Sequence, residues 1–242
     1  MTRAQNEIQH GRKLSERGPE AVWGWGTPAG QRRAARRAAR IMQAAGLKSG
    51  MRALEIGCGS GLFTEIFARS GAEITALDIS DELLDYARQR GLPPNVTLVC
   101  SPFEALDSAD PFDAVIGSSV LHHLDIQPAL AEIFRLLKPG GVMSFAEPNM
   151  LNLQIAIQKN VPWIKEKLGD SPDETAFIRW KLAGQMRRVG FTDIRIRPLD
   201  WLHPATPQGL IPAVEQIGNL LEKLPLVREI SGSVYISARK PD

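Results

Sequence analysis

The segment Leu54-Glu-Ile-Gly-Cys-Gly-Ser-Gly61 constrains the fold of this 242-residue chain more than any other. A short apolar stretch runs into three alternating glycines, and an apolar pattern with helical spacing follows. Glycines let the backbone turn sharply and let a ligand approach it closely. The helix that follows would point unpaired N–H groups at that ligand. The next apolar stretch ends at Asp78, whose carboxylate can accept hydrogen bonds from both hydroxyls of a ribose. The segment therefore predicts a site for a ligand that contains a nucleoside.

The spacing of the glycines separates two kinds of nucleotide site. The dinucleotide-binding fingerprint is G-x-G-x-x-G, which would place a glycine where this chain has Leu62. The chain instead has E-x-G-x-G-x-G, with Glu55 two residues before the first glycine. A nicotinamide-dependent oxidoreductase is therefore a disfavoured alternative.

The chain resembles the class I S-adenosylmethionine-dependent methyltransferases, in particular the branch that includes the ubiquinone and menaquinone C-methylases. The resemblance rests on the glycine segment with Asp78, on Leu-His-His-Leu at 121–124 and on Leu-Leu-Lys-Pro-Gly-Gly at 136–141. It covers about residues 46–148. It implies S-adenosylmethionine as the cofactor and an α/β fold. That fold is a doubly wound sheet of seven strands in the order 3-2-1-4-5-7-6, with strand seven antiparallel and helical cap elements.

Strand and helix patterns alternate from Met51 onward, which supports a parallel sheet with helices on both faces. Strands are expected at Arg52–Ile56, Glu73–Leu77, Val96–Cys100, Val142–Ala146, Phe191–Arg197 and Ser233–Arg239. The fourth strand and its exit are expected within Phe112–Leu124, with an apolar run that reaches Gly117 and Ser118. We divide the chain into an N-terminal helical cap (1–50), a cofactor-binding core (51–148), a helical lid insertion (149–182) and a C-terminal part of the sheet (183–242) with an insertion at 200–230.

The resemblance places the cofactor at the carboxyl ends of the strands. Small residues after the fourth strand would lie beside its methionine end, and a residue after the third strand would contact adenine. The resembled family often has aspartate at the adenine position, where this chain has Ser101 beside Phe103. The location of that contact is therefore expected, while its residue stays open. The expected cofactor-binding residues are Glu55, Gly57, Cys58, Gly59, Gly61, Asp78, Ile79, Ser101, Pro102, Phe103 and Ser118.

An oxygen or carbon acceptor would also need a base, and the candidate catalytic residues are His123, Glu147 and His203. His123 and Glu147 each have a structural interpretation beside the catalytic one. The Leu-His-His-Leu phrase occurs in resembled methylases of different chemistry. A structural role is therefore favoured for His123, and more strongly for His122. Glu147 could orient a substrate or act as a base, and it could equally cap a helix or form an ion pair.

Tryptophans in irregular segments are the candidate substrate-binding residues. Trp23 and Trp25 lie in a Gly- and Pro-rich segment, where they either fill a core edge or wall a pocket. Trp201 lies in the long connection before the last strand. Three segments are expected to converge over the carboxyl edge of the sheet and enclose the acceptor: 23–30, 152–180 and 200–207. The expected apolar anchors of the lid insertion are Trp163, Phe177 and Trp180.

Positive charge is concentrated near the N-terminus, where residues 1–50 hold ten Lys and Arg against three Asp and Glu. Five arginines between Gln31 and Arg40 fall at i,i+4 spacing and would form a basic stripe on a helix. Such a stripe could hold an anionic substrate, RNA or a membrane surface. We favour a solvated helix face, with the alanines and Ile41 packed inward.

Other features exclude several classes of protein. The first ten residues are too polar for a secretory signal and no apolar run could span a membrane, so we expect a cytoplasmic protein without integral membrane association. Cys58 and Cys100 alone cannot form a zinc site, a disulfide is not expected in the cytosol, and no metal is expected. The Asn/Asp-Pro-Pro-Tyr type of motif found in nucleobase methylases of the resembled superfamily is missing, which argues against nucleic acid as a partner.

We therefore expect methyl transfer from S-adenosylmethionine to a small-molecule acceptor, at oxygen or carbon rather than nitrogen. The alternative is a non-catalytic protein of the same fold that binds S-adenosylmethionine or a partner. The helix expected at Ile211–Leu224 is a candidate surface for a homodimer.

Overall fold

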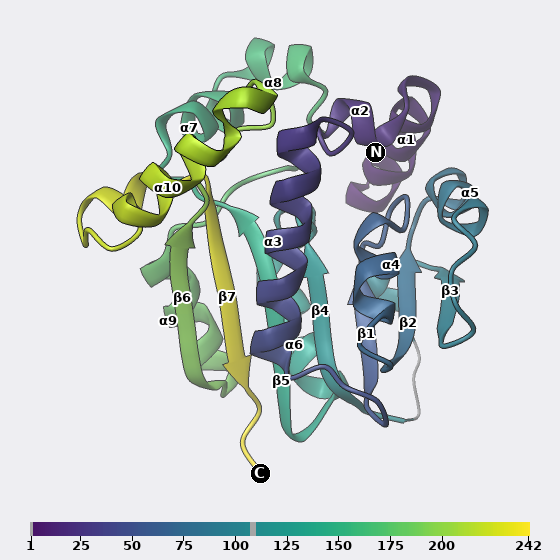
Figure 1. Ribbon diagram of the computed structural model, residues 1–242. Coiled ribbons are helices and arrows are strands. Elements are labelled where there is room, and N and C mark those ends of the chain that lie inside the picture. Colours follow the sequence, from purple (N-terminus) through teal and green to yellow (C-terminus); the bar gives the residue numbers. More distant parts are fainter. Residues whose placement is uncertain (1, 107–109) are drawn as a thin grey trace.

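A seven-stranded sheet lies at the centre of residues 2–106 and 110–242, the part of the chain that the computed structural model describes (Figure 1). Its strands are β1 (Arg52–Ile56), β2 (Glu73–Asp78), β3 (Val96–Cys100), β4 (Phe112–Ser118), β5 (Leu137–Pro148), β6 (Thr192–Leu199) and β7 (Ser233–Arg239). The strand order is β3-β2-β1-β4-β5-β7-β6. The strands β1 to β5 pair in parallel, and β7 is antiparallel to both of its neighbours. The predicted fold class and strand order are therefore confirmed.

Helices cover both faces of the sheet because each presents an apolar stripe to it. They are α3 (Pro28–Ala45), α4 (Leu62–Ala68), α5 (Asp81–Gln89), α6 (Ile126–Leu136) and α9 (Arg179–Val189). On one face α3, α4 and α5 bury Ile41, Phe67 and Leu84 in a common core. On the other face α6 and α9 bury Leu130 and Met186 in a second core. Figure 1 shows α3 in front of the sheet and α6 and α9 behind it. The sheet is thus rigidly held between two apolar layers.

The glycine loop between β1 and α4 has the conformation that its sequence requires. Gly57, Gly59 and Gly61 all have positive φ, at 65°, 52° and 77°, a region that other residues rarely adopt. A Cβ at Gly57 would also lie 2.3 Å from Val120 Cγ2. The backbone N–H of Gly59 donates to Asp78 Oδ2 at 2.8 Å, so the end of β2 fixes the loop.

Further helices lie over the carboxyl edge of the parallel strands, at the top of Figure 1. They are α1 (Arg3–Arg17), α2 (Pro19–Val22), α7 (Leu153–Asn160) and α8 (Pro162–Leu168). Contacts between distant segments hold this cover in place. The Thr27 hydroxyl donates to the Pro204 carbonyl at 2.7 Å, and the Arg3 guanidinium donates to the His123 carbonyl at 2.9 Å. The cover therefore joins the N-terminal segment to the segments after β5 and β6.

Some local predictions are wrong. The strand β5 begins at Leu137 rather than Val142, because Leu137 already pairs with Phe112 of β4. Trp163 and Trp180 are not anchors of the insertion, since 65% and 55% of their surfaces are exposed. Trp163 lies on α8 and Trp180 at the start of α9, and both side chains project outward. Phe177 does anchor the insertion, since it is buried in the second core.

The connection between β6 and β7 contains α10 (Ile211–Leu221), which shortens the helix expected at 211–224 by three residues. Gly218 of α10 packs on Trp201, and Glu215 pairs with Arg32 of α3. Among the described residues, no helix combines the length and apolar character needed to cross a membrane.

Candidate active site

A cavity of about 1130 Å³ lies at the carboxyl edge of the sheet, under the helices that cover it. Of the predicted cofactor-binding residues, those that line it are Gly57, Cys58, Gly59, Asp78, Ile79, Ser101, Pro102, Phe103 and Ser118. Gly61 and Glu55 do not belong to its lining. Nine of the eleven predicted residues therefore lie in the cavity wall, and their binding role stays a prediction.

Asp78 links the glycine loop to the start of α5. Its two carboxylate oxygens accept N–H groups from Gly59 at 2.8 Å and Ser80 at 2.9 Å. Each oxygen has a further lone pair, and the side chain lines the cavity. Burial raises the pKa of Asp78, although these backbone hydrogen bonds oppose the increase. The geometry leaves a carboxylate free to accept hydroxyl groups of a ligand while it holds the loop.

Glu55 lies behind the glycine loop rather than in the cavity wall. Only 1% of its surface is exposed. Burial raises the pKa of Glu55 to about 8, and the nearby negative charge of Asp78 adds to the increase. At neutral pH this carboxyl group is therefore neutral, and one of its oxygens has no hydrogen-bond partner among the described residues.

The basic stripe of α3 is only partly a solvated face, which corrects the prediction. Arg37 is 2% exposed, and it donates to the Ser118 and Ser119 hydroxyls at 3.2 and 2.8 Å. Arg33 pairs with Asp200 at 2.5 Å. Both guanidinium groups lie 5.2 Å from the centroid of Trp25. These contacts compensate the burial of two charges, and both arginines line the cavity.

The spacing of the buried residues of α3 could have identified Arg37. Ala34, Ala38 and Ile41 form the apolar stripe of the helix, and Arg37 falls between them at i+3 from Ala34 and i−4 from Ile41. The outer arginines instead form ion pairs with acidic residues of the β6–β7 connection: Arg32 with Glu215, and Arg36 and Arg40 with Glu222.

The candidate substrate tryptophans come together at the cavity. Trp23, Trp25 and Trp201 all line it, and so do residues from each of the three segments expected to converge there. Trp25 is 6% exposed and packs edge-on against Phe63 of α4, with ring centroids 5.4 Å apart. The indole N–H of Trp201 is buried without a hydrogen-bond partner in the described part of the chain. The expected placement is therefore found, and acceptor binding by these rings stays a prediction.

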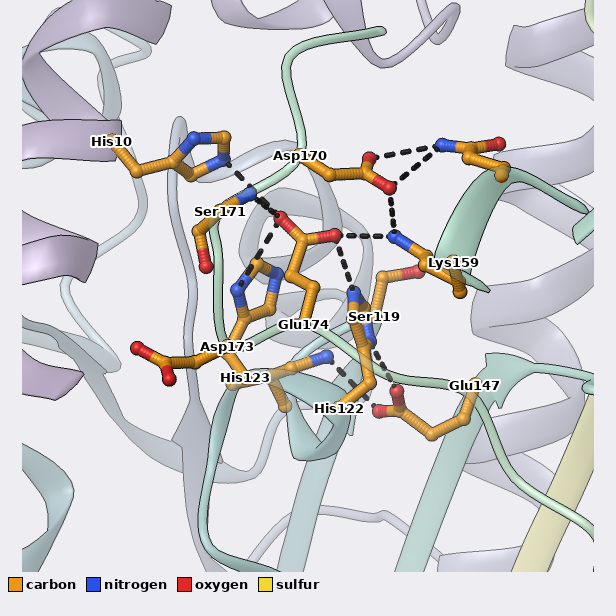
Figure 2. Close-up of polar contacts among 12 residues, drawn as sticks. His10, Ser119, His122, His123, Glu147, Lys159, Asp170, Ser171, Asp173 and Glu174 are labelled. Atoms are coloured by element: carbon orange, nitrogen blue, oxygen red, sulfur yellow. Dashed lines mark hydrogen bonds and ion pairs between the residues drawn. The ribbon is translucent and has the colours of Figure 1, made fainter. Parts of the chain in front are cut away.

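Glu147 holds His122 from beneath the cavity. One oxygen of Glu147 accepts the N–H groups of Val120 and Leu121 at 3.0 and 2.9 Å. Its other oxygen lies 2.7 Å from His122 Nδ1 (Figure 2). Glu147 is fully buried and does not line the cavity, whereas His122 does. The geometry makes Glu147 a positioning residue for His122. It places His122, for which a structural role is favoured more strongly than for His123, at the cavity with an oriented ring.

Glu174 lies at the centre of a polar cluster that forms part of the cavity wall (Figure 2). Its carboxylate lies 3.8 Å from a ring nitrogen of His10, of His122 and of His123. Lys159 of α7 contacts both Glu174 and Asp170. His123 Nδ1 also lies 2.8 Å from Glu7 of α1. This cluster joins α1, the residues after β4 and the insertion, which are far apart in the sequence.

A model of the methyltransferase domain family matches residues 54–145. Residues 54–145 are therefore similar to methyltransferase domains. The match begins in β1 and ends in β5, so it contains the glycine loop, Asp78 and the histidine pair.

Curated relatives of the methyltransferase domain carry related names. The chain is 39% identical over 106 residues to "Ubiquinone biosynthesis O-methyltransferase" of Xanthomonas oryzae pv. oryzae. The matched region covers 42% of this chain and 44% of that protein. The chain is also 32% identical over 107 residues to "Nodulation protein S" of Rhizobium tropici, and this match covers 42% of this chain and 45% of that protein. The chain therefore spans less than half the length of the curated relatives it matches.

Solved structures share the fold over nearly the whole chain. The N-methyltransferase NodS of Bradyrhizobium japonicum, in complex with S-adenosyl-L-homocysteine, matches with a TM-score of 0.67 at 16% identity, covering 98% of this chain and 100% of that one. The [4+2]-cyclase SpnF matches with a TM-score of 0.67 at 21% identity, covering 100% and 97%. Because one fold supports different reactions, the activity has to be argued from the site.

The groups around the methyltransferase domain fit S-adenosylmethionine. The glycine loop offers a close backbone approach, and Asp78 offers acceptors to a ribose. Arg37 is a buried cation beside Ser118, and its Nε–H has no partner among the described residues. An orphaned donor on a positive charge suits the carboxylate of a methionine moiety.

The cluster around Glu174 contains both neutral and charged groups. Burial lowers the pKa of His122 and of His10, so both rings are neutral at neutral pH. Burial also disfavours the charged form of His123, but Glu7 and Glu174 outweigh it and raise the pKa of that ring. Burial opposes ionisation of Glu174, yet the histidines and Lys159 hold the pKa of that carboxyl far below its usual value.

His203 lies in the cavity wall outside this cluster. Its ring is exposed, Nδ1 accepts the N–H of Ala205 at 3.1 Å, and Nε2 lies 3.3 Å from the Gln154 amide nitrogen. Glu7, His10, Lys159 and Glu174 were missed by the sequence reasoning, because no local motif marks them and only the fold brings them together.

Proposed function

We propose that the protein transfers the methyl group of S-adenosylmethionine to an oxygen atom of a small-molecule acceptor. The observation that carries this proposal is a single cavity lined by two different groups of residues. The glycine loop and Asp78 form one group, which we assign to the cofactor end, and the histidines and carboxylates around Glu174 form the other, which we assign to the acceptor end. The names of the curated relatives, which include an O-methyltransferase, support oxygen as the acceptor atom.

The cofactor would occupy the end of the cavity formed by the methyltransferase domain. Asp78 would accept the ribose hydroxyls, and Ser101 to Phe103 would border the adenine. Arg37 would bind the methionine carboxylate, a role that its burial and its unpartnered Nε–H favour. Bound S-adenosylmethionine supplies a methyl group on a positively charged sulfur, which needs little further activation.

The chain's own contribution is alignment, exclusion of water and removal of a proton. Trp25 and Trp201 would hold an apolar acceptor in line with the methyl group, and the covering helices would exclude solvent. A hydroxyl acceptor has to lose its proton as the new bond forms. His122 and His10 are neutral rings in the cavity wall, and each can accept a proton. We also infer a cytoplasmic location and no nucleic-acid partner, in keeping with a covered cavity of small-molecule size.

Calorimetry and mass spectrometry test this function in order. S-adenosylhomocysteine should bind the purified protein with one site per chain, while NAD should not bind. Incubation with S-adenosylmethionine and a panel of phenols, hydroxylated quinone precursors and amines should then yield a methylated oxygen product. Binding of S-adenosylhomocysteine without any product would favour the non-catalytic alternative. A product methylated only on nitrogen would refute the oxygen assignment.

A further inference from the structure

Three of the four histidines of the chain gather around one buried carboxylate at the acceptor end of the cavity (Figure 2). We propose that His122, His123 and Glu174 form a binding site for a divalent transition-metal ion. This proposal deepens the proposed function, because it concerns the end of the cavity that would receive the acceptor. It was not predicted from the sequence, in which no metal site was expected.

The geometry of these three side chains suits one ion. A ring nitrogen of each histidine and an oxygen of Glu174 all lie within 4.8 Å of one another. His122 Nε2 lies 3.8 Å from one carboxylate oxygen of Glu174, and His123 Nδ1 lies 3.8 Å from the other. Ligands on a tetrahedral ion with bonds of about 2.1 Å are about 3.4 Å apart, so small side-chain rotations would complete the site. Glu7 lies next to these atoms, 2.8 Å from His123 Nδ1, and could add a ligand.

Glu147 supports His122 in the way that metal-binding histidines are commonly supported. A carboxylate 2.7 Å from Nδ1 favours a proton on that nitrogen, because Glu147 acts as a hydrogen-bond acceptor here and already accepts two backbone N–H groups. The lone pair on Nε2 then points away from Glu147 toward Glu174. Two acceptor atoms face each other there, and a cation between them would stabilise both.

The charge around the site also favours a cation. The carboxylates of Glu7, Glu147, Asp170 and Glu174 are all largely buried. Lys159 supplies one fixed positive charge, and it contacts two of them. Arg3 donates to the backbone carbonyls of His123 and Asp173, and the Asp173 carboxylate accepts the side-chain amide of Asn6 at 2.7 Å. The carboxylates therefore exceed the fixed cations, and a divalent ion would offset the excess.

Ligand chemistry selects the class of ion. Imidazole nitrogens with a carboxylate suit Zn²⁺, Co²⁺, Ni²⁺ or Mn²⁺ better than Mg²⁺, which prefers oxygen ligands. A divalent ion in this place would lower the pKa of an acceptor hydroxyl that reaches the cluster. The O–H bond would break with its proton passing to His10, and the oxygen would then attack the methyl group as the carbon–sulfur bond breaks.

Cobalt titration tests the site without any need for turnover. Protein stripped with a chelator is titrated with Co²⁺, and the visible absorption of the ion reports coordination by nitrogen and oxygen. We expect saturation at one equivalent and displacement of Co²⁺ by Zn²⁺. Glu174→Gln and His122→Ala should each weaken Co²⁺ binding by at least about tenfold. Glu147→Gln, which changes only the support of His122, should weaken it by about tenfold as well.

Matched variants separate this site from chance binding. His203→Ala removes the histidine that lies in the cavity wall outside the cluster, and it should leave Co²⁺ affinity within about twofold. Lys159→Gln removes the competing cation, so it should strengthen Co²⁺ binding. Circular dichroism and S-adenosylhomocysteine binding would show that each variant is folded.

Three results would overturn the proposal. They are an absence of any visible band in the native protein, equal affinity in native protein and Glu174→Gln, and a loss of binding in His203→Ala alone. Because the titration contains neither cofactor nor acceptor, its failure leaves the proposed methyl transfer standing. Conversely, a protein that binds Co²⁺ but not S-adenosylhomocysteine would support the proposed metal site and refute the proposed function.

Discussion

Glu55 should make the protein less stable as the pH rises, and Glu55→Gln should remove this effect. The carboxyl group is 1% exposed, and burial raises its pKa from about 4.5 to about 8 in the folded protein. In the unfolded chain the group ionises near its ordinary pKa. Between these two pH values the unfolded state releases a proton that the folded state keeps. The contribution of Glu55 to the free energy of unfolding is therefore complete below about pH 4.5 and is lost as the pH rises toward 8.

The size of this effect follows from the difference between the two pKa values. Each unit corresponds to about 1.4 kcal/mol, so the full loss is on the order of 5 kcal/mol. The free energy of unfolding of the native protein should therefore fall by about 1.4 kcal/mol for each pH unit in this window, relative to the glutamine variant. Above about pH 8 the two curves should become parallel.

Urea unfolding at half-unit pH steps between 5 and 9 measures this difference. Glu73→Gln is the matched control, because Glu73 is an exposed glutamate on the neighbouring strand β2, and its curve should follow that of the native protein. Parallel curves for the native protein and Glu55→Gln throughout the window would refute the reasoning. Calorimetry adds a second check. Because Glu55 does not line the cavity, S-adenosylhomocysteine affinity should stay within about twofold.

Other substitutions test the cavity. Asp78→Asn should lower S-adenosylhomocysteine affinity at least about tenfold by calorimetry, whereas the exposed Asp81→Asn should leave it unchanged; equal affinity in both would remove Asp78 from the site. Gly59→Ala should lower the free energy of unfolding by about 1 kcal/mol because its φ is 52°, and a melting curve identical to the native one would contradict this. Trp201→Ala should reduce acceptor turnover with little change in cofactor affinity; a change of mass in light scattering with turnover intact would instead indicate a homodimer contact. Hydrogen exchange should be faster in α7 and α8 than in α3, and the reverse order would contradict the burial pattern.

The central part of the fold was predictable because local patterns determine it. The bounds of β1 and β3 agree with those expected, since each is an apolar run ended by a turn. The glycine loop was recognisable from spacing alone, because only glycine suits its positive φ values. The order of the strands came from the family resemblance, since an alternating pattern does not specify which strands become neighbours.

The acceptor end of the cavity could not be predicted in the same way. Glu7 and Glu174 meet at His123 although 167 positions separate the two carboxylates in the chain. Neither has a neighbour in sequence that marks it as unusual. The burial of Arg37 was different, because its position in the apolar stripe of α3 was visible, and the general preference of arginine for solvent led to the wrong interpretation.

The two sides of the cavity differ in what holds them. The helix α3 buries seven residues against the sheet, whereas α7 and α8 bury none and depend on polar contacts. Arg33 and Arg37, at the cofactor end, therefore lie on a fixed support. Lys159 and Glu174, at the acceptor end, belong to the insertion, and their contacts with His122 and His123 bring it onto the core. Because apolar burial makes the larger contribution to stability, the insertion is the side that should open to admit an acceptor. Closure then assembles the cluster around Glu174, so the residues that would bind a cation or accept a proton come together only when the cavity is covered.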